Sequence, residues 1–315
     1  RLCLLEGAAV ETVSVGGQRL RIGFIGYGAV ASTFARAMAA RGAQVYAYDV
    51  LLDEEDGRER LALRAGDVWV ELLPLDEMVT SVAYVFSTNA ADVALTVAEQ
   101  CAPLLREGQV YLDLNSTSPQ VKRQIGHAVA PSGADFVEGA ILDAVGAAGA
   151  GAQILLGGPH AARVAEALCG LGLNVAAFSD QIGAASTLKM LRSVFSKGVE
   201  ALLIECLVAA RRAGLQDALW EALTETMRGA SFEAQADNWV RTHASAYERR
   251  YHEMVQVEDT LRDLGLDPIM TAATRALFAR SCDLGVGDAF PEGAGRMDAV
   301  IAYLERQLGR VDANE

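Results

Sequence analysis

The sequence has few cysteines, and no two of them form a CxxC pair. The chain of 315 residues contains 5 cysteines at widely separated positions. An odd, scattered set is typical of reduced structural thiols in a cytoplasmic protein, so we expect neither a zinc site nor a disulfide framework, and no metal. These cysteines are Cys3, Cys101, Cys169, Cys206 and Cys282.

Positive charge is also scarce. Lys and Arg number 27 against 41 Asp and Glu, which gives a formal net charge of −14 and a pI near 4.8. Such a field repels the phosphate backbone of nucleic acids and anionic membrane surfaces, so neither is expected as a partner. A small anionic substrate would therefore need a local cationic pocket.

Long apolar runs are missing as well. The most apolar stretches, residues 141–156 and 199–210, are interrupted by Asp143, Glu200 and Glu205. A membrane-spanning helix needs about 20 predominantly apolar residues. The first residues also lack the basic flank and clean apolar core of a secretory signal. We therefore expect a cytoplasmic protein.

What the chain does contain is a regular alternation of short apolar runs and helix-like segments. Helical spacing of apolar residues is evident in residues 30–41, 91–105 and 119–130. Strands that alternate with such helices predict a doubly wound parallel sheet of the α/β class. The apolar runs lie at residues 22–25, 44–48, 68–72, 82–87, 110–114, 134–137 and 153–156.

The composition and periodicity of the sequence change near residue 180. Beyond it, β-branched runs disappear and long Ala-, Leu-, Glu- and Arg-rich segments with a 3.6-residue period extend almost to the C-terminus. The sequence thus predicts a Rossmann domain over residues 21–180 and an all-helical domain over 181–315. Residues 1–20 alternate weakly around Val10, Thr12 and Val15, which indicates an N-terminal extension, either an appended strand or a loose lead-in, with no assigned function.

A dinucleotide-binding motif opens the first domain. Residues 22–31 read as a strand, a GxGxxA turn and the start of a helix, and this context makes the motif specific. Gly26 permits the tight turn, Gly28 lets the backbone approach a pyrophosphate, and Ala31 lets the helix pack closely on the strand. The helix N-terminus supplies unpaired N–H groups and a positive dipole.

An acidic residue follows at the expected distance. Asp49 ends the second apolar run, 23 residues after Gly26, where a carboxylate accepts hydrogen bonds from the adenosine ribose. This position favours NAD over NADP, although Asp49 could simply cap the next turn. We expect cofactor contacts from Gly26, Tyr27, Gly28, Ala29, Val30 and Asp49, and from Ser87, Thr88 and Asn89 at the carboxyl end of a later strand.

Three segments resemble the β-hydroxyacid dehydrogenase superfamily, which includes 3-hydroxyisobutyrate and 6-phosphogluconate dehydrogenases. Residues 23–28 are similar to its GFIGxG signature. Residues 113–119 are similar to its DxSTxxP substrate-binding stretch, with Asn115 and Ser116 where Ser and Thr are usual. Residues 183–189 are similar to its GxGxxxK segment. The resemblance implies substrate contacts from Asn115, Ser116 and Thr117, and it places Lys189 on the family's catalytic lysine.

The chain departs from that family at two positions. Ser193 stands where the family has an asparagine four residues after the lysine, and residues 142–144, Leu-Asp-Ala, replace an SGG loop that holds a substrate carboxylate. Residues 189–198 instead resemble a phosphogluconate-dehydrogenase-like branch with its own helical C-terminal domain. That branch carries an Arg-Arg-x-His-Glu segment, matched at residues 249–253, which makes His252 a candidate substrate contact.

The local sequence around Lys189 also suits general acid–base chemistry, independently of the family resemblance. It lies in an apolar stretch that opens a long helix, where burial would favour a neutral amine able to accept a hydroxyl proton. A lysine whose head extends to solvent from a core helix is the alternative. Arg192, Ser193 and Lys197 share a face with it at helical spacing, and this basic stripe predicts a grip on an anionic substrate, although Arg192 could equally form a structural ion pair.

These features together predict an oxidoreductase. We expect hydride transfer between NAD, or alternatively NADP, and a small hydroxy acid or related hydroxyl compound, with or without decarboxylation, while residues 146–151 form a lip over the site. An imine reductase and a catalytically silent dinucleotide-binding protein are the alternatives. The amphipathic helices and the resemblance imply a homodimer.

Overall fold

A computed structural model describes residues 14–15 and 18–311 of the chain. The chain divides into two compact units between Ser193 and Val194. Val10 and Thr12 of the predicted extension lie outside the described residues. Within it, β1 (Ser14–Val15) pairs antiparallel with β2 (Gln18–Arg19).

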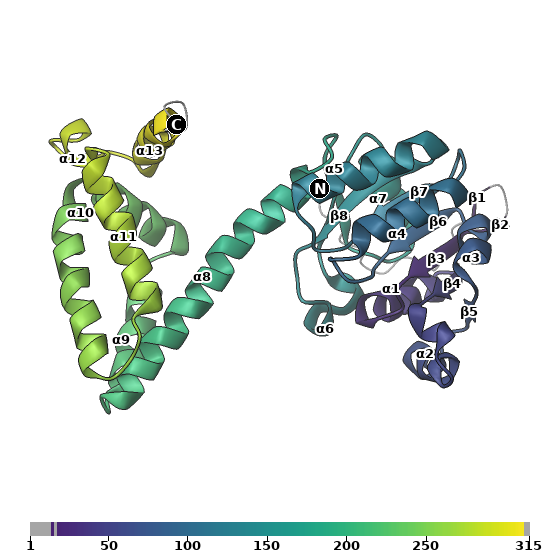
Figure 1. The fold of residues 1–315 in the computed structure, drawn as a ribbon, viewed down its shortest axis with the longest axis horizontal. Helices are drawn as coiled ribbons and strands as arrows, with labels where there is room; N and C mark the ends of the chain where they lie inside the picture. Colours follow the sequence, from purple (N-terminus) through teal and green to yellow (C-terminus); the bar gives the residue numbers. More distant parts are fainter. Residues whose placement is uncertain (1–13, 16–17, 312–315) are drawn as a thin grey trace. The chain divides into compact units, whose positions relative to one another are not determined.

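A sheet forms the centre of the first unit (Figure 1). It has eight strands in the order β10-β9-β8-β7-β6-β3-β4-β5. Neighbouring strands are parallel except β8 and β9. The strands are β3 (Arg21–Ile25), β4 (Gln44–Tyr48), β5 (Val70–Leu72), β6 (Tyr84–Ser87), β7 (Val110–Asp113), β8 (Asp135–Ile141), β9 (Ile154–Gly157) and β10 (Val175–Ser179). The predicted doubly wound α/β sheet is confirmed, and its strand order reverses beside β3, where such sheets bind ligands.

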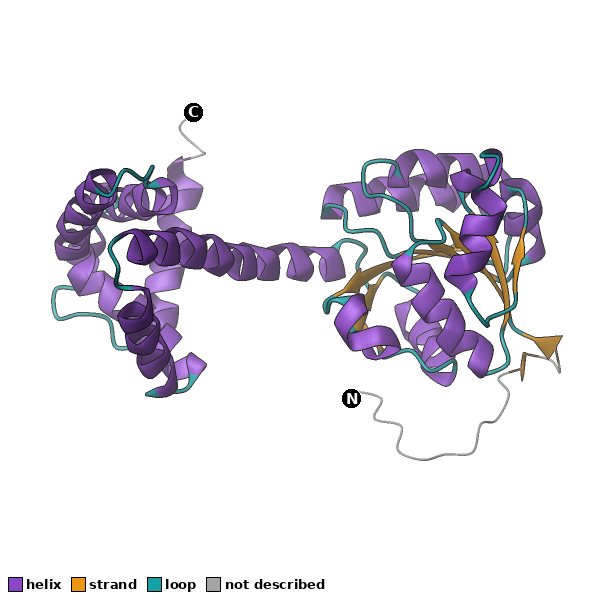
Figure 2. Ribbon diagram, turned by 90° about the horizontal axis from the view of Figure 1, so that it is seen from below, coloured by secondary structure: helices purple, strands orange, loops and turns teal. Residues whose placement is uncertain are grey.

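Helices cover both faces of this sheet (Figure 2). One core contains side chains of α1 (Ala29–Ala40), α2 (Gly57–Ala65) and α7 (Ala161–Gly170) together with Phe24. The other contains side chains of α3 (Leu75–Ser81), α4 (Ala94–Cys101) and α5 (Pro119–Val129) together with Ile25. Because successive strand residues point to opposite faces, apolar side chains on both faces produced the continuous apolar runs in the sequence.

The edge strand β10 was not predicted. Of its residues only Val175 is fully buried, whereas Ala177 and Phe178 are exposed. An edge strand packs on one neighbour only, so it carries neither the alternation nor the apolar run that identifies a strand in a sequence.

The second unit is helical throughout its described residues, as predicted. Helix α8 (Ala184–Arg212) begins in the first unit and continues into the second. It is followed by α9 (Gln216–Arg228), α10 (Phe232–Asp263), α11 (Ile269–Asp283), α12 (Val286–Ala289) and α13 (Met297–Val311). Glu205 links α8 to α11, because its carboxylate accepts hydrogen bonds from the Met270 and Thr271 amides at the start of α11. No helix in the described ranges is both long and apolar enough to cross a membrane.

Candidate active site

Polar side chains line up where neighbouring parallel strands end. The pairing register places Ile25 of β3 beside Ser87 of β6, Ser87 beside Asp113 of β7, and Asp113 beside Glu138 of β8. Ser87, Asp113 and Glu138 are all fully buried. Buried polar groups need hydrogen-bond partners: Asn115 donates to Ser87 and Asp113, and amides at the start of α8 donate to Glu138.

The glycine turn after β3 has the geometry that a dinucleotide requires. Gly26 adopts φ +83°, and a Cβ there would lie 2.9 Å from backbone atoms of Thr88 and Asn89. A Cβ on Gly28 would meet no protein atom within 4 Å. Helix α1 starts directly after Gly28 with no side chain capping its first amides and no acidic residue in its first turn. These residues therefore fit a pyrophosphate at the helix N-terminus.

The Asp49 carboxylate is hydrogen-bonded to the same turn. Its Oδ2 accepts a hydrogen bond from the Tyr27 amide at 2.8 Å, and its Oδ1 accepts one from the Leu51 amide at 3.0 Å. The side chain of Tyr27 points into the core, and burial raises its pKa to about 12, so only its backbone faces the turn. Arg64 of α2 reaches the Tyr27 carbonyl at 3.4 Å. A cation therefore stands beside the turn as well.

A cavity of about 470 Å³ lies at this edge of the sheet. It brings together seven residues that the sequence assigned to cofactor, substrate and catalysis: Ala29, Val30, Thr88, Asn89, Asn115, Ser116 and Lys189. Its other lining residues are Ala91, Leu114, Ile141, Asp143, Val145 and Gly146. Val145 and Gly146 belong to the short helix α6 (Val145–Ala148), at the start of the predicted lip.

Lys189 lies on the first turns of α8, at the cavity. Its Nζ donates a hydrogen bond to Ser116 Oγ at 2.6 Å, and the residue is partly exposed rather than buried. The start of α8 is fixed by Glu138, whose Oε1 accepts from the Gly183 and Ala185 amides at 2.8 and 2.9 Å. A carboxylate at a helix N-terminus is favoured by the helix dipole. Glu138 therefore holds the helix that carries Lys189 against the sheet.

A buried ion pair supports the substrate-binding stretch. Lys122 Nζ donates to Asp113 Oδ2 at 2.7 Å and to the carbonyl of Asn115 at 2.8 Å, and both charged side chains are essentially inaccessible. No sequence motif predicted this pair. Lys122 occupies the apolar face of α5 together with Ile125, Gly126 and Val129, so a lysine at a core position of a predicted helix was the available signal.

Arg192, which is predicted to grip an anionic substrate, bonds to the neighbouring loop in the first unit. Arg192 Nη1 donates to the Leu142 carbonyl at 2.8 Å, and Nη2 lies 3.9 Å from Asp143. Arg192 is not among the residues that line the cavity. Its guanidinium thus holds the loop that replaces the family's SGG segment, which is the structural alternative that the spacing left open.

The remaining predicted substrate contacts lie elsewhere. Thr117 is buried and does not line the cavity, and its Oγ1 has no partner among the described atoms. Ser193 is the last residue of the first unit. Lys197 is exposed on α8 in the second unit. His252 lies on α10 in a shallow hollow with Arg249 and Glu253, which form an ion pair.

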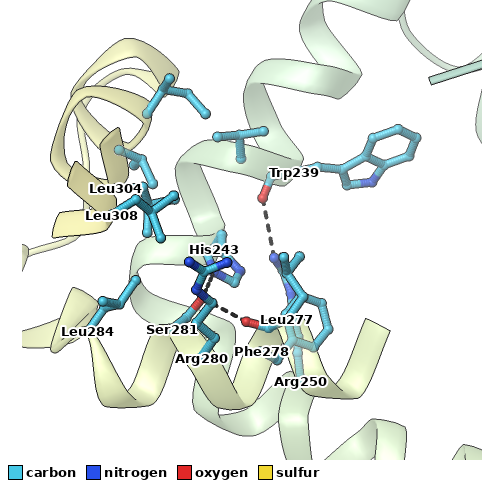
Figure 3. Close-up of a pocket in the computed structure, with 13 residues that line it drawn as sticks. Trp239, His243, Arg250, Leu277, Phe278, Arg280, Ser281, Leu284, Leu304 and Leu308 are labelled. Carbon is cyan, nitrogen blue, oxygen red and sulfur yellow. Dashed lines mark hydrogen bonds between the residues drawn. The ribbon is translucent and has the colours of Figure 1, made fainter. Parts of the chain in front are cut away.

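The second unit contains a separate cavity of about 490 Å³, between α10, α11 and α13 (Figure 3). Its walls are mainly apolar, and His243 Nε2 lies 2.8 Å from Ser281 Oγ within it. Arg250 donates to the Trp239 carbonyl at 3.3 Å on another wall. None of the residues predicted to bind cofactor or substrate lines this cavity. In the described part of the chain, no three His, Cys, Asp or Glu side chains are grouped as a metal site.

Comparison with known proteins identifies the class. Residues 21–177 match the NAD binding domain of 6-phosphogluconate dehydrogenase, and residues 210–281 match a domain of unknown function, DUF1932. A solved protein of unknown function, described as structurally similar to 3-hydroxyacid dehydrogenases, is 32% identical, with 84% of this chain and 97% of that chain covered and a TM-score of 0.57.

Two more distant relatives carry described activities. A 2-(hydroxymethyl)glutarate dehydrogenase from Eubacterium barkeri is 21% identical over 92% of this chain and 96% of its own. An imine reductase from Myxococcus stipitatus, in complex with NADP+, is 16% identical over 90% and 99% of the two chains, with a TM-score of 0.72. The protein thus has an NAD-binding domain, and its general class is that of the NAD(P)-dependent oxidoreductases. It belongs to the β-hydroxyacid dehydrogenase superfamily, in the branch with a DUF1932 helical domain, as the sequence motifs predicted.

Proposed function

We propose that the protein transfers a hydride between a nicotinamide dinucleotide and a small hydroxy acid or related hydroxyl compound, with Lys189 as the general acid–base. The observation that carries the proposal is the cavity that Lys189 shares with Ala29 and Val30 of the dinucleotide turn and with Ser116. When bound, the dinucleotide supplies the hydride chemistry. The protein then has to orient the hydroxyl and move one proton.

Lys189 Nζ and Ser116 Oγ are placed for that proton movement. During oxidation, neutral Nζ accepts the proton of the substrate hydroxyl; during reduction, the ammonium returns it to the forming alkoxide. Ser116 Oγ, 2.6 Å from Nζ, restricts the orientation of the amine. Asn115 contributes an amide at the same wall, and Ala29 and Val30 present the first amides of α1 to the dinucleotide.

The test is a turnover screen with a matched variant. Small hydroxy acids, neutral hydroxyl compounds and cyclic imines are incubated with NAD(H) and with NADP(H), and the change in reduced cofactor is measured. Lys189→Ala is expected to lower kcat by about 10²- to 10⁴-fold while dinucleotide binding is retained. Arg211→Ala, exposed near the end of the same helix, serves as the control. Unchanged turnover in Lys189→Ala would contradict the acid–base role.

Two other functions share this site. Asp143, a carboxylate in the lining, would favour a protonated imine, so imine reduction is the second candidate. Turnover of imines but of no alcohol would select it. Binding of the dinucleotide without turnover of any compound would instead indicate a catalytically silent dinucleotide-binding protein.

Arg192, Ser193, Lys197 and His252 stay candidate substrate contacts. Arg192 donates to the Leu142 carbonyl through Nη1, so an anionic group would have to meet its other N–H donors. His252 and Lys197 belong to the second unit, and a role for either needs that unit, from the same or another copy, at the site. Substitution of each by Ala, with KM measured for an acid and its neutral analogue, tests these contacts.

A cytoplasmic homodimer is part of the proposal. Large apolar side chains of α8 in the second unit are exposed, including Val194 at 73%, Phe195 at 55% and Ile204 at 59%. Contiguous exposed apolar surface of this kind marks a protein interface. Light scattering coupled to gel filtration is expected to give twice the chain mass of 33.4 kDa; a monomer at micromolar concentration would contradict it.

A further inference from the structure

The orientation of the Asn115 amide is set by its neighbours. Asn115 Nδ2 donates to Asp113 Oδ1 at 2.5 Å and to Ser87 Oγ at 2.9 Å. A carboxylate only accepts hydrogen bonds, so the amide nitrogen, and not the oxygen, must face Asp113. Lys122 holds the other oxygen of the same carboxylate, at 2.7 Å. The Asp113–Lys122 pair therefore turns Asn115 Oδ1 away from itself.

That oxygen is a buried acceptor with no partner among the described atoms. Asn115 is only 6% exposed, and it lines the cavity that contains Lys189. Buried polar atoms in native proteins are almost always hydrogen-bonded, so an orphaned one at a cavity wall indicates a ligand group that would satisfy it. The missing partner must be an N–H or O–H donor.

A second acceptor stands on the same cavity. Asn89 Nδ2 donates to Ser87 Oγ at 3.3 Å, which leaves its buried Oδ1 without a partner among the described atoms. Asp143 adds a carboxylate, and Lys189 is the one cation among the residues that line this cavity. A carboxylate placed beside either amide oxygen or beside Asp143 would bring one more acceptor to an acceptor.

We propose that Asn115 Oδ1 is a specificity-determining acceptor that selects a donor-bearing group, such as a carboxamide, an ammonium or a second hydroxyl, beside the reacting carbon or on the nicotinamide. Asp113 and Lys122 are positioning residues for this atom. The inference rests on the proposed function for the identity of the cavity. Where the substrate supplies the donor, the inference narrows the substrates from hydroxy acids to hydroxyl compounds whose flanking group is neutral or cationic.

Paired probes that differ only in donor capacity test this inference. Calorimetric titration of the NAD-loaded protein compares 3-hydroxybutanamide with 4-hydroxypentan-2-one, in which a methyl group replaces the amide nitrogen. A second arm compares NADH with reduced 3-acetylpyridine adenine dinucleotide, in which a methyl group replaces the carboxamide nitrogen. We expect the donor-bearing member to bind about tenfold more tightly in one arm, as one hydrogen bond allows, and that arm identifies whether substrate or cofactor supplies the donor.

Asn115→Leu, which keeps the volume but removes the acceptor, should abolish the preference in that arm. Asp113→Asn should reduce it, because two facing amides let Asn115 turn and present its nitrogen to the cavity. Asn89→Leu is the second variant if these proteins do not fold, which circular dichroism reports. No preference in either arm, or one that survives every substitution, would overturn the inference. Since the readout is binding, an absence of turnover would count against the proposed function and leave this inference intact.

Discussion

The two units of this chain bury their apolar residues to very different degrees. The Rossmann unit encloses two extensive clusters around its sheet. The buried cluster of the helical unit consists of Ala244, Val286, Ala294 and Val300, while Trp220 and Ile204 stay more than half exposed. A domain with its own packed core can fold alone, whereas extensive exposed apolar surface is typical of an interaction site.

The same contrast holds for polar groups. The Rossmann unit buries Asp113, Lys122 and Glu138 at the edge of its sheet, each hydrogen-bonded to the loops that form the candidate site. In the helical unit, the buried Glu258 pairs with Arg262 and Arg275, which are themselves partly or largely exposed. We infer that the first unit carries the proposed chemistry and the second unit carries the assembly.

The largest effect is expected at the buried ion pair. Lys122→Met leaves Asp113 charged and unpaired, which should lower the free energy of unfolding of the Rossmann unit by about 3–5 kcal/mol. Urea denaturation followed by circular dichroism measures this. Lys197→Met, on an exposed surface, is the control and should change little. Adding Asp113→Leu to Lys122→Met should recover part of the lost stability. Equal stability of Lys122→Met and Lys197→Met would contradict the prediction.

A smaller effect should separate the surfaces of the two units. Ile204→Asp in the helical unit should weaken self-association by at least about 2 kcal/mol, roughly thirtyfold in the dissociation constant, because an unpaired carboxylate would be buried. Leu63→Asp, at a residue 76% exposed in the Rossmann unit, should leave association unchanged. Light scattering across a dilution series measures both. If the two substitutions change self-association equally, the assignment of self-association to the helical unit is wrong.

The sequence predicted the fold well because periodicity is a local property. Buried strands and amphipathic helices each carry their own pattern, whereas the edge strand β10 does not. The site was less predictable because partners far apart in the chain decide it. Arg192 has the chemistry of an anion clamp, yet its guanidinium donates to the Leu142 carbonyl, fifty positions earlier, and does not line the cavity. The proposed acceptor role of Asn115 depends likewise on the ion pair between Lys122 and Asp113. Spacing in the sequence does not reveal that these two residues pair.

Two glycines of the dinucleotide turn should respond differently. Gly26→Ala places a Cβ against Thr88 and Asn89 at φ +83°, which should cost about 1–2 kcal/mol of stability in the Rossmann unit. Gly28→Ala meets open space, so stability should hold while dinucleotide affinity falls about tenfold or more. Thermal denaturation and NADH fluorescence titration separate the two outcomes. Full NADH affinity in Gly28→Ala would place the pyrophosphate elsewhere.

The smallest effect concerns pH and the helical unit alone. His243 packs between the rings of Tyr247 and Phe278, and burial together with the charge of Arg250 lowers its pKa. The unfolded chain, with a histidine pKa near 6.5, then binds the proton first as the pH falls. This contribution to stability is therefore present above about pH 6.5 and is lost below it.

His243→Gln should remove that dependence, since glutamine can still bond to Ser281 but does not titrate. Urea denaturation at pH 7.5, 6.5 and 5.5 measures it, in a Trp69→Phe background that restricts tryptophan fluorescence to Trp220 and Trp239 of the helical unit. The stability of the unsubstituted unit should fall more steeply with acid than that of His243→Gln. Parallel pH profiles would show that the cavity in Figure 3 leaves His243 free to protonate in the folded state.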